Sequence, residues 1–310
     1  MTAARLSSLL NNLAIAKPCA GCSSRSASTR WSSTDGLYSL TVTNLDTKQP
    51  NMLRRGVVCV VLAGGVLSAN ATITHASSRA TSSTAQGSIT VSAAASLTDA
   101  FRALAREFRS EHPKVRLRFN FGSSSALVSQ IQAGAPADVF AAADTSSVDK
   151  LAASGQVNKT PRIFARNSLQ IAVKPGNPLK ITSLVGLSKA RVVALCAKTV
   201  PCGVYAATAL QRAAVVLPES NVSRGVDAKA TIGAVVNGDA DAAVVYATDV
   251  RAAGRSVASV TIPKAHNVTA MYAIASLRES KNAKAAQAFI DFVMSSVGQS
   301  TLVRFGFARP

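Results

Sequence analysis

Four expected helix starts after residue 88 offer the same kind of anion-binding group. Ser96 stands between a strand and a helix with Asp99 three residues later, the spacing of a capping box. Ser124 lies in a Gly-Ser-Ser-Ser run, and Cys202 and Val226 stand where two more helices should begin. A helix start presents unpaired N–H donors and the positive end of the helix dipole, so it can hold an anion without a cationic side chain. Four converging starts would bind a dehydrated dianion, although each serine alone would more often be an ordinary helix cap.

The elements that position these residues alternate between strand and helix. We expect strands at 89–91, 115–121, 138–141, 169–173, 192–195, 242–246 and 271–275, and helices at 96–109, 124–133, 147–153, 203–213, 227–237, 283–294 and 298–304. Hydrophobic residues make up 48% of the chain and aromatic residues only 5%, so Ala, Val, Leu and Ile must build the core, which suits an α/β fold. Repeated strand–helix units predict parallel pairing, with ligand sites at the carboxyl ends of the strands.

The charge of the chain is strongly positive. There are 34 Lys and Arg residues against 15 Asp and Glu, a formal net charge of +19. Nucleic-acid binding would suit such a charge, but the basic residues are scattered singly, and no basic run is interleaved with aromatic residues. We therefore expect no nucleic-acid partner. A diffuse positive field serves equally well to attract small anions.

The segment before residue 88 has the layout of an export signal. A basic start and an apolar run at 57–67, followed by small residues, predict a secretory signal peptide at 52–76 and a linker at 77–87. The apolar run is too short to span a membrane. The protein is therefore expected outside the cytoplasmic membrane.

Two features of the leader leave alternatives open. For residues 1–51, either translation starts at Met52, which we favour, or the segment is an organellar transit sequence, because it is basic and rich in serine. Cys59 lacks the small residues that should precede a lipid-anchor site, so a lipid anchor is not supported.

The cysteines after residue 88 are Cys196 and Cys202. In the oxidising compartment that an export signal implies, a nearby pair usually forms a disulfide. Pro201 and Gly203 help to turn the chain, so the two Cα atoms could come within the ~4.4–6.8 Å that a disulfide requires. Two buried free thiols are the alternative, and a redox-active pair is disfavoured because the spacing is not C-x-x-C.

Five segments, in the correct order, resemble those of one known family. They are Ile89–Leu97, Gly122–Leu127, Gln132–Phe140 with its G-A-P-A-D string, Val244–Asp249, and Phe305–Phe307. Together they closely resemble the periplasmic molybdate-binding proteins, the solute-binding component of a molybdate ABC importer. The likeness covers residues 88–310.

The resemblance implies a fold beyond what the strand–helix pattern predicts. It implies a two-lobe, type II periplasmic binding protein of α/β class, with mixed, mostly parallel sheets and a double-crossover hinge. Lobe one would comprise residues 88–165 and 268–310, and lobe two would comprise residues 166–267. The two lobes would close around the ligand.

The resemblance also implies a ligand set. Ser96 and Ser124 would donate from hydroxyl and main-chain N–H, and Tyr246 would donate its phenol. Cys202, where the family more commonly has alanine, and Val226 would each donate a main-chain N–H. The ligand would be molybdate or tungstate, so molybdenum would be present only within the bound oxyanion. No catalytic residue and no cofactor are expected, and the partner would be the membrane permease of the importer, with the binding protein itself a monomer.

Two other classes of protein remain as alternatives. The first is a related binding protein for sulfate or another tetrahedral oxyanion, and only the family resemblance favours molybdate over this alternative. An exported serine hydrolase would need a nucleophile elbow such as G-x-S-x-G, which is absent, and a histidine base. His112 and His266, the histidines after residue 88, look like ordinary surface residues.

Overall fold

Residues 85–310 are the part of the chain that the computed structural model describes. The predicted leader at 1–51, the signal peptide at 52–76 and most of the linker at 77–87 lie outside the described residues. The strands are β1 Gly87–Ala94, β2 Val115–Gly122, β3 Val139–Ala142, β4 Arg162–Val173, β5 Val193–Cys196, β6 Val222–Gly225, β7 Ala242–Tyr246, β8 Ala258–Thr261 and β9 Thr269–Ser276.

The strands form a mixed sheet in the order β2-β1-β3-β9-β4-β7-β5-β6, with β8 also paired to β4. The strand β1 pairs in parallel with β2 and β3, and the strand β5 pairs in parallel with β6 and β7. It is antiparallel wherever β4 or β9 takes part. The α/β class is thus confirmed, and the antiparallel pairs mark the strands that join the two halves of the molecule.

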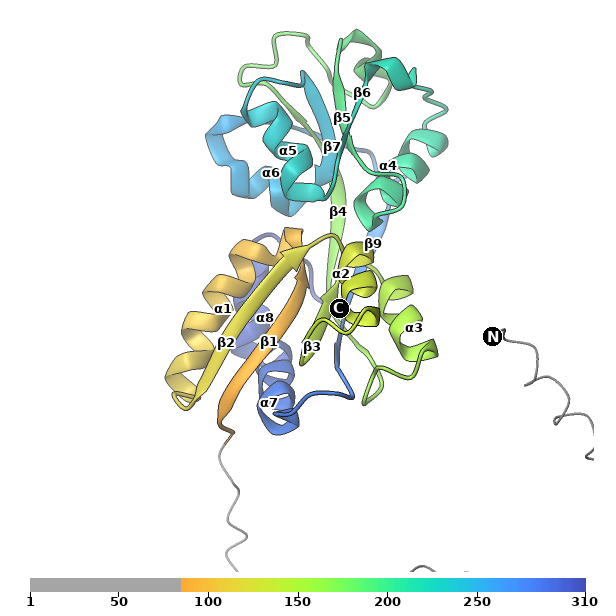
Figure 1. The fold of residues 1–310 in the computed structure, drawn as a ribbon. Coiled ribbons are helices and arrows are strands. Elements are labelled where there is room, and N and C mark those ends of the chain that lie inside the picture. The colour runs from red at the N-terminus through yellow and green to blue at the C-terminus, as the bar shows by residue number, and fades with distance from the viewer. Residues whose placement is uncertain (1–84) are drawn as a thin grey trace, which may run out of the picture. The chain divides into compact units, whose positions relative to one another are not determined.

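The strand β4 links two lobes (Figure 1). Its residues 162–168 pair with β9, whereas residues 169–173 pair with β7 and β8. Lobe one contains β1, β2, β3, β9 and the first part of β4, and lobe two contains β5 to β8 and the rest of β4. The chain crosses once along β4 and returns before β9, which makes a double crossover. The boundaries predicted at 165/166 and 267/268 stay predictions, and β4 changes its pairing partner between Ser168 and Leu169.

The helices cover both lobes. They are α1 Thr98–Glu111, α2 Ser124–Gln132, α3 Thr145–Ala153, α4 Pro201–Arg212, α5 Ala228–Val236, α6 Ala247–Ala253, α7 Ala283–Met294 and α8 Ser296–Arg304. In α1 the apolar residues recur every three or four positions, so Phe101, Leu104 and Phe108 are fully buried on one face. The ring of Phe289 on α7 lies 5.8 Å from that of Phe101 and 5.4 Å from that of Phe108. This packing holds the start of α1, and with it the turn that carries Ser96.

Neither Ser96 nor Ser124 is the cap of its helix. Ser123 caps α2 by accepting the N–H of Ala126, and Asp227 caps α5 by accepting the N–H of Ala230. The capping box predicted at Ser96 is wrong, because Ser96 lies within a 3₁₀ turn, Ala95–Leu97, and α1 begins at Thr98 with no side-chain cap. The Ser96 side chain is therefore free of a capping role.

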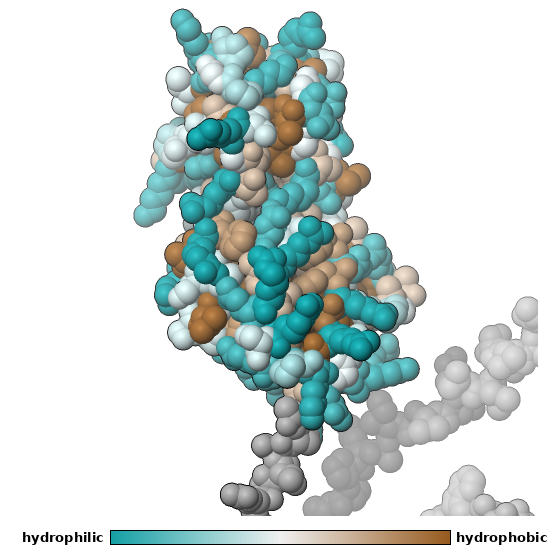
Figure 2. All heavy atoms as spheres, turned by 90° about the vertical axis from the view of Figure 1, so that its left-hand side faces the viewer, coloured by the Kyte–Doolittle hydropathy of each residue, from teal (hydrophilic) through white to brown (hydrophobic). Residues whose placement is uncertain are grey.

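The surface of the described residues is largely hydrophilic on the face drawn in Figure 2, with apolar patches of limited size on both lobes. None of the helices in residues 85–310 is both long and apolar enough to cross a bilayer. The apolar side chains are instead gathered in the core on both sides of the sheet.

Candidate functional site

A small cavity lies between the lobes where the strand ends and helix starts meet. Its walls come from the end of β1 and the 3₁₀ turn, the start of α2, the residue after β3, and the starts of α4 and α5 with the end of β7. The lining residues are Ala94, Ala95, Ser96, Gly122, Ser123, Ser124, Ala143, Val200, Pro201, Cys202, Asp227, Ala228 and Tyr246. The empty space among these residues, part of it open to solvent, is about 220 Å³. The residues of the two lobes therefore stand close together around a small site.

Ser124 is the first residue of α2, and its side chain is 1% exposed. Its Oγ accepts the main-chain N–H of Ala143 at 3.0 Å. Because that N–H can only donate, the Ser124 oxygen is an acceptor there and its own proton remains available for another partner. Ser124 can thus donate to an anion in the cavity.

Ser96 follows β1 and is 6% exposed. Its Oγ lies 2.8 Å from Oη of Tyr272, a residue of β9 whose side chain is completely buried. Ser96 belongs to lobe one, as does Ser124, so lobe one offers two serine hydroxyls to the same cavity.

Cys202 is the second residue of α4 and is joined by a disulfide to Cys196, the last residue of β5, with a Cα–Cα distance of 5.8 Å. Pro201 has no N–H, so the N–H of Cys202 is the first that α4 can offer, and helix geometry leaves it without an intrahelical partner. Gly203 permits the close approach of this turn, because a Cβ there would stand 2.0 Å from the carbonyl oxygen of Ala197.

Val226 differs from the other predicted ligands in its surroundings. Its side chain is 71% exposed, and the cavity wall on that side is formed by the next two residues, Asp227 and Ala228. The predicted contact was a main-chain one, which an exposed side chain permits, and it stays a prediction.

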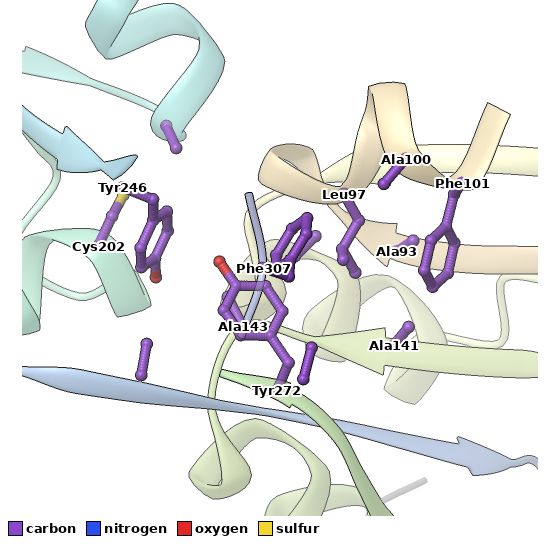
Figure 3. Packing of buried hydrophobic residues seen from close by; sticks show 14 of the residues in the cluster. Ala93, Leu97, Ala100, Phe101, Ala141, Ala143, Cys202, Tyr246, Tyr272 and Phe307 are labelled. Atoms are coloured by element: carbon purple, nitrogen blue, oxygen red, sulfur yellow. The ribbon is translucent and has the colours of Figure 1, made fainter. Parts of the chain in front are cut away.

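Tyr246 ends β7 and is 1% exposed, and its Oη has no hydrogen-bond partner among residues 85–310. Burial raises the pKa of this phenol well above its ordinary value, and Tyr272 and Tyr205 add to the rise, so the hydroxyl keeps its proton. The ring lies against that of Tyr272 at a centroid distance of 5.7 Å, and Figure 3 shows the Tyr272 hydroxyl directed toward it. An unsatisfied buried hydroxyl costs about 1–3 kcal/mol, so Tyr246 is poised to gain a partner.

A buried carboxyl group, that of Asp249, and the ammonium group of Lys229 lie close together near the cavity. Asp249 in α6 has a fully buried carboxylate without a well-formed hydrogen bond. Burial raises the pKa of this carboxyl to about 7; Lys229, with Nζ 4.0 Å from Oδ1, opposes the rise, and Asp227 and Asp99 add to it. Lys229 on α5 also reaches Oδ2 of Asp99 on α1, at 2.6 Å. This ion pair joins the two lobes beside the cavity.

The donors among the lining residues are neutral groups. Among the residues around the cavity there is no Lys, Arg or His, and the carboxylate of Asp227 is engaged at the start of α5. Residues 85–310 also contain no group of three or more His, Cys, Asp or Glu side chains that could hold a metal ion. Hydroxyl and main-chain N–H donors without a cation suit a small anion that arrives fully deprotonated.

Sequence reasoning missed three buried polar residues behind the cavity. Tyr272, Asn167 and Thr248 are hydrogen-bonded to one another or to Ser96, although 81 to 176 positions separate the partners along the chain. The one available signal was Asn167 itself, a polar residue just before the strand predicted at 169–173.

The chain is similar to known solute-binding proteins along most of its length. The family model described as bacterial extracellular solute-binding protein matches residues 89–308. A molybdate-binding protein of Mycobacterium tuberculosis is 35% identical over 259 residues, which cover 83% of this chain and 98% of that protein.

Solved structures show the same fold. The periplasmic molybdate-binding protein of Azotobacter vinelandii superposes with a TM-score of 0.65 at 18% identity, over 72% of this chain and 99% of that one. The sulfate-binding protein SubI of M. tuberculosis gives a TM-score of 0.66 at 20% identity, over 72% of this chain and 87% of that one. At these identities the structures establish the fold and do not separate the two anions.

Proposed function

The chain belongs to the bacterial extracellular solute-binding proteins, in the molybdate-binding family, and on that premise we propose that it captures molybdate for an ABC importer. The anion would bind in the cavity between the lobes. The loaded protein would then deliver it to the membrane permease of the importer.

The observation that carries this proposal is the unpartnered hydroxyl of Tyr246, which is buried in a cavity without cationic side chains. A hydroxyl in this position gains a hydrogen bond to a charged acceptor when the ligand binds, an interaction worth about 1.5–3 kcal/mol. Ser124, whose oxygen already accepts the N–H of Ala143, supplies a second donor from the other lobe. A bound anion that accepts hydrogen bonds from both lobes would thus favour the closed form.

Selectivity would follow from the donor set. A protonated oxyanion such as hydrogen phosphate brings an O–H that the hydroxyl and N–H donors of the cavity are not placed to receive, and a buried unpaired donor costs roughly 1–3 kcal/mol. The Asp227 carboxylate, which already accepts the N–H of Ala230, is the one anionic group in the wall. Tungstate, which is nearly the same size as molybdate and equally deprotonated, should bind as well. Sulfate carries the right charge but is smaller, so the size of the cavity must exclude it.

The remaining donors would be main-chain groups. Cys202 would contribute its N–H from the start of α4, held in place by the disulfide to Cys196. Val226 would contribute its N–H beside the start of α5. Ser96 would donate its hydroxyl from lobe one, so that ligands from both sides of the hinge surround the anion.

The ion pair of Lys229 and Asp99 would assist closure. It joins α5 and α1, so it can form only when the two lobes are close together. A partly exposed pair of this kind contributes about 0–1 kcal/mol, less at high salt. The anion contacts would therefore supply most of the free energy of closure.

The wider setting of the protein follows from the same proposal. The chain would act as a monomer outside the cytoplasm, in the periplasm or at the outer face of the cytoplasmic membrane, without a lipid anchor. It would catalyse no reaction and carry no cofactor, and molybdenum would be present only as the transported oxyanion. Nucleic acid would not be a partner.

A thermal-shift series with molybdate, tungstate, sulfate and phosphate tests the proposal. At 100 times the dissociation constant a ligand adds about 2.7 kcal/mol to the free energy of unfolding, which corresponds to roughly 5–10 °C for a chain of this size. We expect this shift with molybdate and tungstate and little shift with phosphate. An equal shift with sulfate would overturn the molybdate assignment, because the site would then not discriminate between the two anions.

A further inference from the structure

Four buried side chains form a hydrogen-bonded chain that runs from lobe two, through both crossing strands, to Ser96. Thr248 on α6 is 4% exposed, Asn167 on β4 is 5% exposed, and Tyr272 on β9 is fully buried. Asn167 Nδ2 lies 2.8 Å from Thr248 Oγ1 and 3.3 Å from Tyr272 Oη. Tyr272 Oη in turn lies 2.8 Å from Ser96 Oγ.

The direction of these hydrogen bonds is determined at one end of the chain. The main-chain N–H of Ser168 donates to Asn167 Oδ1 at 2.9 Å, so the amide nitrogen of Asn167 must face Thr248 and Tyr272. An amide nitrogen only donates, so Tyr272 Oη accepts from it. Burial raises the pKa of the Tyr272 phenol far above its ordinary value, so the phenol keeps its proton. Either oxygen could donate in the Ser96–Tyr272 hydrogen bond, but of the two side chains bonded to Tyr272 Oη only Ser96 can accept that proton, which favours donation from Tyr272 to Ser96 Oγ.

The consequence reaches the cavity. If Ser96 Oγ accepts the proton of Tyr272, the hydroxyl proton of Ser96 is free to point at a ligand. Ser124 is in the same state by a different route, since its oxygen accepts the N–H of Ala143. Both serine oxygens therefore have a donor behind them, and neither needs to accept from the ligand.

We propose that Asn167 and Tyr272 are positioning residues that hold the Ser96 hydroxyl as a donor and thereby make the cavity reject protonated oxyanions. The inference rests on the proposed function and deepens it by naming what sets the selectivity. Neither residue touches the ligand in this scheme, because Tyr272 and Asn167 act through Ser96.

A matched pair of probe anions separates proton rejection from size. Selenate and hydrogen arsenate are dianions of similar size at pH 8, and only hydrogen arsenate carries an O–H. The ratio of their affinities, measured by competition against molybdate with the purified full-length chain, reports the donor character of the cavity. Tyr272→Phe removes the proton that Ser96 accepts and lets the serine hydroxyl rotate.

For Tyr272→Phe we expect molybdate affinity to fall about 3- to 10-fold, as for the loss of one neutral hydrogen bond. We also expect the preference for selenate over hydrogen arsenate to fall by at least about 3-fold, because Ser96 can then accept the arsenate proton. Tyr205→Phe is the matched control, since Tyr205 also packs against the Tyr246 ring but lies outside the chain to Ser96. It should change neither quantity.

Asn167→Asp is a second variant, and it should reverse the direction of the hydrogen bonds from Tyr272 to Ser96. It tests the inference even if Tyr272→Phe does not fold. The new carboxylate keeps the acceptor for Ser168 but takes the proton of Tyr272, whose oxygen can then accept from Ser96. The Ser96 oxygen would face the cavity with its lone pairs. The added charge weakens both dianions alike, so the selenate-to-arsenate ratio should fall further than in Tyr272→Phe.

The outcomes distinguish this inference from the proposed function. Wild-type protein that binds molybdate, with an unchanged anion ratio in Tyr272→Phe and Asn167→Asp, would overturn the inference alone. The same holds if both variants lose all anions equally, because that result assigns the residues a purely structural role. Wild-type protein that binds none of the tetrahedral oxyanions would overturn both.

Discussion

Replacing Tyr246 with phenylalanine should change ligand affinity and stability in opposite directions. The Tyr246 hydroxyl is buried and has no hydrogen-bond partner within residues 85–310, an arrangement that costs about 1–3 kcal/mol. Phenylalanine removes this cost and keeps the ring contacts with Tyr272 and Tyr205. The unliganded variant should therefore be as stable as the wild type or more stable.

The affinity for the anion should fall in the same variant. A hydrogen bond from a neutral donor to a charged acceptor contributes about 1.5–3 kcal/mol, so Tyr246→Phe should weaken molybdate binding by about 10- to 150-fold. Isothermal titration calorimetry gives the affinity, and thermal unfolding without ligand gives the stability. Tyr205→Phe is the control, since it removes a phenol outside the cavity wall and should leave the affinity unchanged.

The combination of the two results is decisive. A large loss of affinity together with a loss of stability would indicate that the hydroxyl is needed for folding and would refute the argument from the unpartnered Tyr246. An unchanged affinity would show that the phenol does not meet the ligand.

Three further changes have expected outcomes that follow from the same structure. Ser124→Ala should weaken molybdate binding by about 10- to 150-fold in titration calorimetry, whereas an effect below about 3-fold would remove Ser124 from the ligand set. Reduction of the Cys196–Cys202 disulfide should lower the free energy of unfolding by about 2 kcal/mol in denaturant titrations. If the molybdate affinity stays constant on reduction, the bridge only stabilises the fold. Two free thiols in the intact mass of the exported protein would contradict the bridge itself. Asp249→Asn should abolish a fall in stability that the wild type shows as pH rises from about 4 to about 7. The folded carboxyl, with its pKa raised to about 7, keeps a proton that the unfolded chain releases near 3.8, the ordinary pKa of an aspartate carboxyl. The variant should gain most over the wild type at pH 8, by roughly 3–5 kcal/mol, and equal pH profiles of melting temperature would contradict the buried state of Asp249.

Sequence reasoning located elements whose pattern is local. The strand at 242–246 and the helix at 283–294 were predicted with the bounds that the structure has, since an unbroken apolar run and a 3.6-residue period are visible without tertiary information. The strands β6 and β8 were missed because they are short and partly exposed, V-S-R-G and A-S-V-T, and owe their conformation to pairing with β5 and β4. The first part of β4 was missed because polar residues interrupt its apolar pattern.

Some residues of the site could likewise be predicted from the sequence, and others could not. Ser96, Ser124 and Cys202 could be placed from their positions between strand and helix, and the structure brings all three to one cavity. The capping box predicted at Ser96 was wrong, because a 3₁₀ turn delays the start of α1 to Thr98. Asn167 and Tyr272 could not be assigned from the sequence, since their partners lie 81 to 176 positions away and only the packing of the hinge strands brings them together.

The cavity between the lobes should take a fully deprotonated tetrahedral dianion and prefer molybdate. The most direct measurement is a calorimetric titration of the purified protein with molybdate, repeated in the presence of excess sulfate and then of excess phosphate. The structure and family together predict one molybdate per chain and an affinity that phosphate leaves unchanged and sulfate reduces little. Equal competition by sulfate would contradict the preference for molybdate, and the absence of any heat of binding with molybdate, tungstate or sulfate would contradict the site.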